Sequence, residues 1–153
     1  FAFGPMAVLA GALSQQAAFH PYVLAAMPLT GLSTASILWM GQMIDLPADA
    51  AAGKRGMVAR LGSGVARYGF VVIHLLLAAG IAVLAWRLQP AGWIILIALL
   101  PYPLLFRRAW RTVHRCHDQP AELKAAAGLN VQMHLLFSLL IVVALILVLI
   151  LNT

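Results

Sequence analysis

The last part of this chain holds the feature that most restricts its fold, an apolar run over residues 125–151. A helix needs about 20 mainly apolar residues to cross the hydrocarbon core of a bilayer. Only helices and closed barrels satisfy their backbone polar groups in that environment. Other apolar runs reach a similar length, and 63% of all residues are hydrophobic while 9% are charged. The sequence therefore predicts an all-α integral membrane protein.

Five candidate transmembrane helices are separated by turns or polar segments. Small residues between Leu29 and Ser36 would let the second helix approach its neighbours closely, which predicts a central position for it. Pro101 and Pro103 are expected to kink the end of the fourth helix. Residues 1–153 contain no internal repeat and no low-complexity linker, so they are interpreted as one transmembrane domain. The five helices are expected over residues 2–15, 21–45, 65–86, 91–106 and 125–151.

The basic residues are confined to the segments between helices. A net charge of +6 and a pI near 10.5 would point to nucleic acid in a soluble domain, but topology explains these charges better and we expect no nucleic-acid partner. Of ten Lys and Arg residues, four lie between the second and third helices and five between the fourth and fifth. The positive-inside rule then predicts that both basic loops of this multi-pass protein lie in the cytoplasm. We expect the membrane to be the bacterial inner (cytoplasmic) membrane.

The first of these loops places two carboxylates before three cations. Asp45 and Asp49 are four residues apart, so on a helical turn their Cβ atoms lie roughly 5–6 Å apart on one face. Magnesium is usually held by one or two carboxylates together with phosphate oxygens of a substrate. Lys54, Arg55 and Arg60 would donate to the remaining phosphate oxygens. The pattern indicates a site for Mg²⁺ and a diphosphate at the membrane surface. A solvated, charge-balanced loop that only holds the membrane orientation is the alternative.

Other polar residues have simpler explanations. Cys116 is the single cysteine, which excludes an internal disulfide, and its closeness to His114 and His117 gives poor geometry for a tetrahedral metal site. His74 and His134 lie inside apolar runs, where we favour a structural hydrogen bond over a catalytic role. The basic segment over residues 107–111 is interpreted as an interfacial anchor for anionic lipid headgroups.

The loop also carries a family resemblance. Its pattern Asp-x-x-x-Asp-x-x-x-Gly-Lys-Arg-x-x-x-x-Arg-Leu-Gly over residues 45–62 resembles the second aspartate-rich motif of the UbiA superfamily of intramembrane prenyltransferases. The resemblance is strongest to the branch that contains 1,4-dihydroxy-2-naphthoate polyprenyltransferase. Phe3-Gly4-Pro5-Met6 and His134-Leu-Leu-Phe137 support it. Gly56 stands where that branch has threonine, and the first aspartate-rich motif of the family is absent.

The resemblance implies a fold and a chemistry. The five helices would be the C-terminal five of a nine-helix bundle around a central cavity. Asp45 and Asp49 would be the catalytic, metal-binding pair for Mg²⁺, and Lys54, Arg55 and Arg60 would contact the diphosphate. The partners would be a polyprenyl diphosphate and an aromatic acceptor, as in quinone biosynthesis, including that of menaquinone. The alternative is a non-catalytic UbiA-like membrane subunit with a structural or assembly role.

The start of the chain leads to one further expectation. It begins at Phe1, inside an apolar stretch and without the basic region and cleavage site of a signal peptide. We therefore interpret the sequence as the second half of a longer enzyme, which would act with its missing N-terminal half or with other membrane subunits. Because one carboxylate pair supplies only one side of a metal site, this half alone is expected to be inactive.

Overall fold

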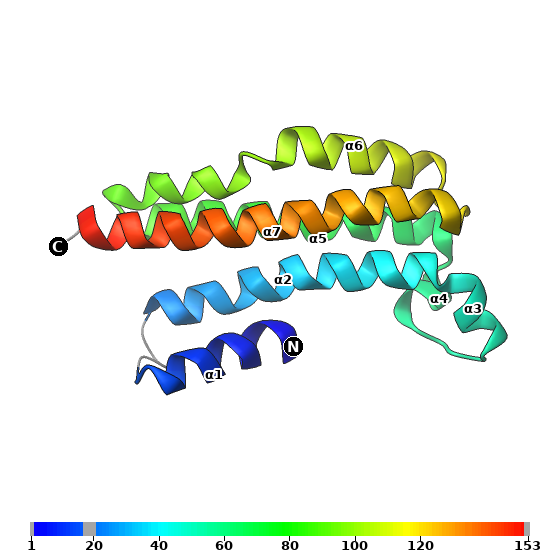
Figure 1. Ribbon diagram of the computed structural model, residues 1–153, viewed down its shortest axis with the longest axis horizontal. Coiled ribbons are helices and arrows are strands. Elements are labelled where there is room, and N and C mark those ends of the chain that lie inside the picture. Colours follow the sequence, from blue (N-terminus) through cyan, green and yellow to red (C-terminus); the bar gives the residue numbers. More distant parts are fainter. Residues whose placement is uncertain (1, 17–20, 152–153) are drawn as a thin grey trace.

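A computed structural model describes residues 2–16 and 21–151, and every regular element in them is a helix (Figure 1). The chain order is a π-helical turn η1 (Ala2–Met6), α1 (Ala7–Ser14), α2 (Pro21–Ile44), α3 (Leu46–Ala51), α4 (Met57–Leu61), α5 (Ser63–Arg87), the 3₁₀ helix η2 (Ala91–Leu99), α6 (Tyr102–Arg115) and α7 (Pro120–Leu151).

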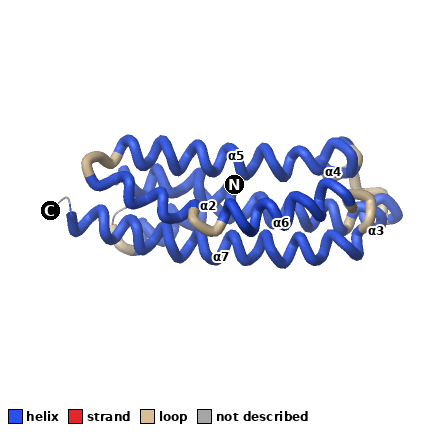
Figure 2. Tube along the Cα trace, turned by 90° about the horizontal axis from the view of Figure 1, so that it is seen from above, coloured by secondary structure: helices blue, strands red, loops and turns tan. Residues whose placement is uncertain are grey.

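The long helices run along one axis and form a bundle (Figure 2). Helix α2 contacts α5 and α7 on one side and η1 and α1 on another, and its end also meets α3 and α4. The predicted central position of α2 is thus confirmed. A Cβ atom on Gly4 would fall 2.6 Å from the backbone nitrogen of Gly31, so the absence of side chains at this point lets η1 lie directly against α2.

Three described helical segments are long and apolar enough to cross a membrane: Ser63–Arg87, Ala91–Arg115 and Pro120–Leu151. A shorter apolar helix covers Gly4–Ser14. The all-helical class and the membrane character are therefore confirmed, whereas the count of five transmembrane helices stays a prediction.

The fourth helix differs from its prediction. It was expected to end at Phe106 and to be followed by a polar stretch, but a 3₁₀ segment ends at Leu99 and a new helix, α6, then continues to Arg115. Pro101 and Pro103 lack amide donors, so the α-helical hydrogen-bond ladder cannot pass through them, yet they are tolerated where a helix begins. The break therefore lies in the middle of this segment and not at its end.

The segment between α2 and α5 was also expected to be a loop and instead contains two short helices. Pro47 lies in the first turn of α3, a position where no amide donor is needed. Gly53 and Gly62 have positive φ angles of 68° and 73°, a conformation that glycine adopts without steric cost, and each follows the end of a short helix.

Two apolar clusters hold the bundle together. The cluster near α3 and α4 contains the fully buried Val58 of α4, Met40 and Met43 of α2, and residues of α5, α6 and α7. The rings of Phe70 and Phe106 stack within it, with centroids 5.6 Å apart. This packing fixes the end of α2 and therefore the position of the segment that follows it.

The bundle interior also contains polar side chains that join helices. Ser33 Oγ lies 2.8 Å from His134 Nδ1, and Ser36 donates to Asn130 Oδ1 at 3.2 Å, so both pairs connect α2 with α7. His74 Nδ1 donates to the carbonyl oxygen of Phe70 at 2.8 Å. The hydrogen bonds predicted for His74 and His134 are present, and their structural role stays a prediction.

Candidate functional site

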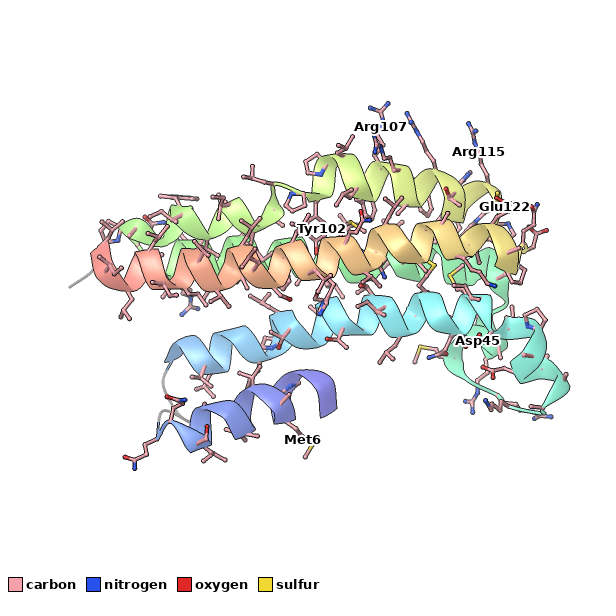
Figure 3. The ribbon with its side chains drawn as sticks, viewed as in Figure 1. Met6, Asp45, Tyr102, Arg107, Arg115 and Glu122 are labelled. Atoms are coloured by element: carbon pink, nitrogen blue, oxygen red, sulfur yellow. The ribbon has the colours of Figure 1, made fainter. Side chains whose placement is uncertain are left out.

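The two carboxylates lie at the junction of α2 and α3. Asp45 follows the last residue of α2, and its amide still donates to Gly41 at 2.9 Å as in a continuing helix. Its carbonyl oxygen in turn accepts the amide of Asp49 at 2.8 Å. The two residues are therefore one helical turn apart, as their spacing predicted. Figure 3 shows Asp45 at the end of the bundle where α3 begins.

Asp49 is already in contact with one of the predicted phosphate ligands. Lys54 Nζ lies 3.0 Å from Asp49 Oδ1, and the Lys54 amide donates to the Asp49 carbonyl oxygen at 2.9 Å. The Lys54 side chain is 70% exposed, whereas that of Asp49 is 22% exposed. A hydrogen bond and the negative charge of Asp49 raise the pKa of Lys54 above its ordinary value of 10.5, and the charge of Asp45 adds to this effect.

A turn at Gly53 makes the contact between Lys54 and Asp49 possible. The Gly53 amide donates to Ala50 at 3.1 Å as α3 ends, and the left-handed conformation of Gly53 turns the chain back toward Asp49. After the turn, Arg60 Nε donates to the carbonyl oxygen of Arg55 at 3.1 Å, which links α4 to the segment before it. Local hydrogen bonds therefore gather cations that are six residues apart in the sequence.

These cations line a cavity of about 410 Å³ at the surface. We call it the basic groove; its lining residues are Leu46, Ala50, Gly53, Lys54, Arg55, Ala59 and Arg60. All three side chains predicted to bind a diphosphate thus lie around one cavity. Guanidinium and ammonium groups are the usual protein ligands of phosphate oxygens.

Gln42 has a role that the sequence did not reveal. Its Oε1 atom accepts a long hydrogen bond of 3.5 Å from the Val58 amide, and a Cβ atom on Gly56 would lie 3.1 Å from the same oxygen. Gln42 therefore connects α2 to the start of α4. A polar residue near the end of an apolar helix was the available signal, but its partner is 16 residues away.

The donor set fits one side of a magnesium site. Asp45 and Asp49 offer carboxylate oxygens, which are hard ligands, one helical turn apart. Proteins usually hold Mg²⁺ with one or two carboxylates together with phosphate oxygens. In the described ranges, no group of three or more His, Cys, Asp or Glu residues is placed to hold a metal ion. Further ligands would have to come from a substrate or from residues outside this part of the chain.

Both basic segments lie at the same end of the bundle (Figure 1). Arg67, near the start of α5, donates to the carbonyl oxygen of His114 at 3.2 Å, and His117 Nδ1 lies 3.2 Å from Ser63 Oγ. These contacts hold the end of α6 and the α6–α7 connection against the start of α5, next to α4. The prediction that the two loops share one end of the molecule is confirmed.

Comparison with known proteins identifies relatives. The profile of the UbiA prenyltransferase family matches residues 1–130, which include all five predicted site residues. A 2-carboxy-1,4-naphthoquinone phytyltransferase from Synechocystis sp. is 32% identical over 134 residues, covering 86% of this chain and 42% of that protein. The chain thus spans less than half the length of this curated relative. No solved structure matches the chain. With most of its length matched by the family profile, this chain belongs to the UbiA prenyltransferase family.

Proposed function

We propose that this chain forms the C-terminal part of a Mg²⁺-dependent aromatic prenyltransferase embedded in the membrane. The enzyme would transfer a polyprenyl group from a polyprenyl diphosphate to an aromatic acceptor, as in quinone biosynthesis. One observation carries this proposal: Asp49, one helical turn after Asp45, is paired with Lys54, which lines the groove together with Arg55 and Arg60. The name of the Synechocystis relative supports an acceptor of the naphthoquinone class.

Each polar group has a part in the reaction. Asp45 and Asp49 would hold the metal, which when bound supplies positive charge that stabilises the leaving diphosphate. Lys54, Arg55 and Arg60 would donate to the diphosphate oxygens, whose negative charge increases as the allylic C–O bond breaks. The apolar bundle would keep water away from the prenyl cation until a ring carbon of the acceptor attacks it.

The ion pair with Asp49 positions the Lys54 ammonium at the groove before substrate binds. A phosphate oxygen would then accept a hydrogen bond from Lys54 as the Asp49 carboxylate turns to its metal-binding role. Binding would thus exchange one charge-assisted contact for another at little cost in side-chain entropy.

The complete site would require ligands from elsewhere. Asp45 and Asp49 provide one wall of a metal site, and near-octahedral coordination needs more oxygens than two carboxylates give. The missing ligands would come from the N-terminal part of the protein or from partner membrane subunits. We therefore propose that the 153-residue chain is inactive by itself. A non-catalytic membrane subunit of the same fold is the alternative, which an activity assay separates from an enzyme.

We also propose that the end of the bundle with the basic groove faces the cytoplasm of a bacterial cell. Nine of the ten Lys and Arg residues lie between the end of α2 and the first turns of α5 or from the middle of α6 to the start of α7, and all of these segments are at this end. Arg87, at the far end of α5, is the exception. This distribution follows the positive-inside rule.

The test is prenyl transfer by the full-length protein carrying Asp45→Asn or Asp49→Asn. Loss of a metal ligand should lower the rate by a factor on the order of 100 or more, as found for groups that stabilise transition-state charge. Asp118→Asn is the matched control, because Asp118 is an exposed acid in the α6–α7 connection and should not alter the rate. Full activity of the Asp49→Asn enzyme, with membrane insertion unchanged, would show that the carboxylate assignment is wrong.

A further inference from the structure

One face of α6 carries four exposed arginines: Arg107, Arg108, Arg111 and Arg115. With 3.6 residues per turn, their Cα atoms fall within an arc of about 100°. The opposite face holds the fully buried Ala109 and Val113. Within the described ranges, Lys54 and Asp49 form the one ion pair, so these four guanidinium groups have no carboxylate partner there. We call this surface the α6 arginine face.

The α6 arginine face begins where the outer surface stops being apolar. Leu100 and Leu104, which precede it, are 68% and 57% exposed. Arg108 follows Leu104 by one helical turn, so the surface changes from apolar to basic over a few ångströms. In a helix that crosses a bilayer, such a boundary marks the level where hydrocarbon gives way to headgroups.

An aromatic pair independently indicates the same position for the boundary between hydrocarbon and headgroups. Tyr68 of α5 and Trp110 of α6 have ring centroids 6.1 Å apart, and Tyr68 is exposed. The Arg67 guanidinium lies 4.9 Å from the centre of the Tyr68 ring. Tyrosine and tryptophan are enriched at the membrane–water interface, where their rings lie among the headgroups. With these rings among the headgroups, the neighbouring arginines would lie at the depth of lipid phosphates.

Helix geometry brings these arginines toward the bilayer. Side chains lean toward the N-terminus of their helix, which in α6 is the apolar end. Arg107, Arg108 and Arg111 can thus reach back to the phosphate level, whereas Arg115 lies about 12 Å farther along the axis than Arg107. Figure 3 shows Arg107 and Arg115 projecting from the side of the bundle opposite Asp45, so this surface is separate from the basic groove.

We propose that the α6 arginine face binds the phosphate headgroups of anionic phospholipids in the surrounding bilayer. The contact would hold α6 and the adjoining end of the bundle at a fixed depth. Another protein segment with carboxylates is the competing occupant, but four unpaired cations at the hydrocarbon boundary fit lipid phosphates directly. This proposal does not depend on prenyl transfer.

The experiment measures the lipid preference of the full-length protein. The protein is purified in detergent, mixed with phosphatidylglycerol or phosphatidylcholine, and its bound lipids are counted by native mass spectrometry. Each cation near an anionic surface changes binding by about fivefold, so Arg107→Gln/Arg111→Gln should lower the preference for phosphatidylglycerol by about 30-fold. Arg115→Gln should have a smaller effect, about twofold or less, because of its distance from the phosphate level.

Two further variants make the result specific. Arg87→Gln/Lys124→Gln removes the same net charge outside the α6 arginine face and should leave the preference unchanged. Arg107→Lys/Arg111→Lys keeps the charge and should retain most of the preference. Comparison with the Gln variant then shows whether a lost preference comes from the lost charge or from disturbed folding. An unchanged preference in the Arg107→Gln/Arg111→Gln protein would overturn the proposal. So would an equal loss in the control pair, or a native protein without any preference, which would assign this surface to an acidic protein partner.

Discussion

Lys54 Nζ and Asp49 Oδ1 lie 3.0 Å apart, so one contact joins a predicted phosphate ligand to a predicted metal ligand. The carboxylate is the more buried partner and the ammonium is the more exposed one. Asp49 therefore fixes where Lys54 enters the basic groove. The contact also partly neutralises one of two carboxylates that would otherwise repel each other one helical turn apart.

This contact predicts a change in the titration of Lys54. Asp49→Asn removes the charge that raises the Lys54 pKa, so that pKa should fall toward 10.5. Asp45→Asn should have a smaller effect, since Asp45 acts through its charge alone. NMR titration of isotopically methylated lysines, with the Lys54 signal assigned by Lys54→Arg, measures both shifts.

The sign of the linked stability follows from the raised pKa. The contribution of this ion pair to folding is fully present below pH 10.5 and is lost as the pH rises through the higher pKa of the folded state. An Asp49→Asn protein whose Lys54 titrates as in the native protein would contradict the contact.

A second prediction concerns the hydrogen bond between α2 and α7. Ser36 Oγ lies 2.7 Å from the carbonyl oxygen of Ser33 and 3.2 Å from Asn130 Oδ1, so its single proton serves two acceptors. Such bonds inside membrane proteins contribute about 0.6 kcal/mol on average and at most about 1.7 kcal/mol. Ser36→Ala and Asn130→Ala should therefore show a coupling free energy of about 0.6 kcal/mol in a double-mutant cycle.

Reversible unfolding in mixed micelles gives the free energies for this cycle. Ser138→Ala supplies the matched control, because Ser138 lies on α7 more than two helical turns from Asn130. Its cycle with Asn130→Ala should give a coupling close to zero. If both cycles gave the same coupling, the hydrogen bond would have no specific role in joining α2 to α7.

A third prediction concerns two glycines of α5. A Cβ atom on Gly69 would overlap the indole ring of Trp39, whose Nε1 donates to Ala66 at 2.8 Å. Gly69→Ala should destabilise the protein by about 1–3 kcal/mol, because the ring must move and lose this bond. Gly64→Ala should be neutral or slightly stabilising, since its Cβ would meet nothing within 4 Å. Thermal unfolding in detergent compares the two, and equal melting temperatures would refute the packing of Trp39 on Gly69.

A fourth prediction concerns orientation in the membrane. Cysteines introduced at Ala52 and Asp118 should react with an impermeant thiol reagent from the cytoplasmic side, because both positions lie at the end that carries the basic segments. A cysteine at Gln89, in the turn after α5, should react from the opposite side. The native Cys116 is first replaced by serine. Labelling of positions 52 and 118 from opposite sides would contradict the bundle as described.

The sequence by itself determined the helical membrane class, the approximate bounds of α2, α5 and α7, and the placement of Asp45 and Asp49 on one helical turn. These properties depend on the length of apolar runs and on residues four apart, so they are local. Proline positions marked the break before α6, although the helix beyond it was missed because charged residues on its outer face resemble a polar loop.

Only the tertiary structure decided which distant residues meet. The link from Gln42 to Val58, 16 residues away, depends on how α4 packs against α2, whereas the contact of Lys54 with Asp49 needs only the local turn at Gly53. The basic segment over residues 107–111 was evident from the sequence, but only the burial of Ala109 and Val113 showed that its arginines share one exposed face of a helix with Arg115. Such contacts arise from the packing of whole helices, and the same apolar sequence permits several arrangements of helix faces until neighbouring helices are in place.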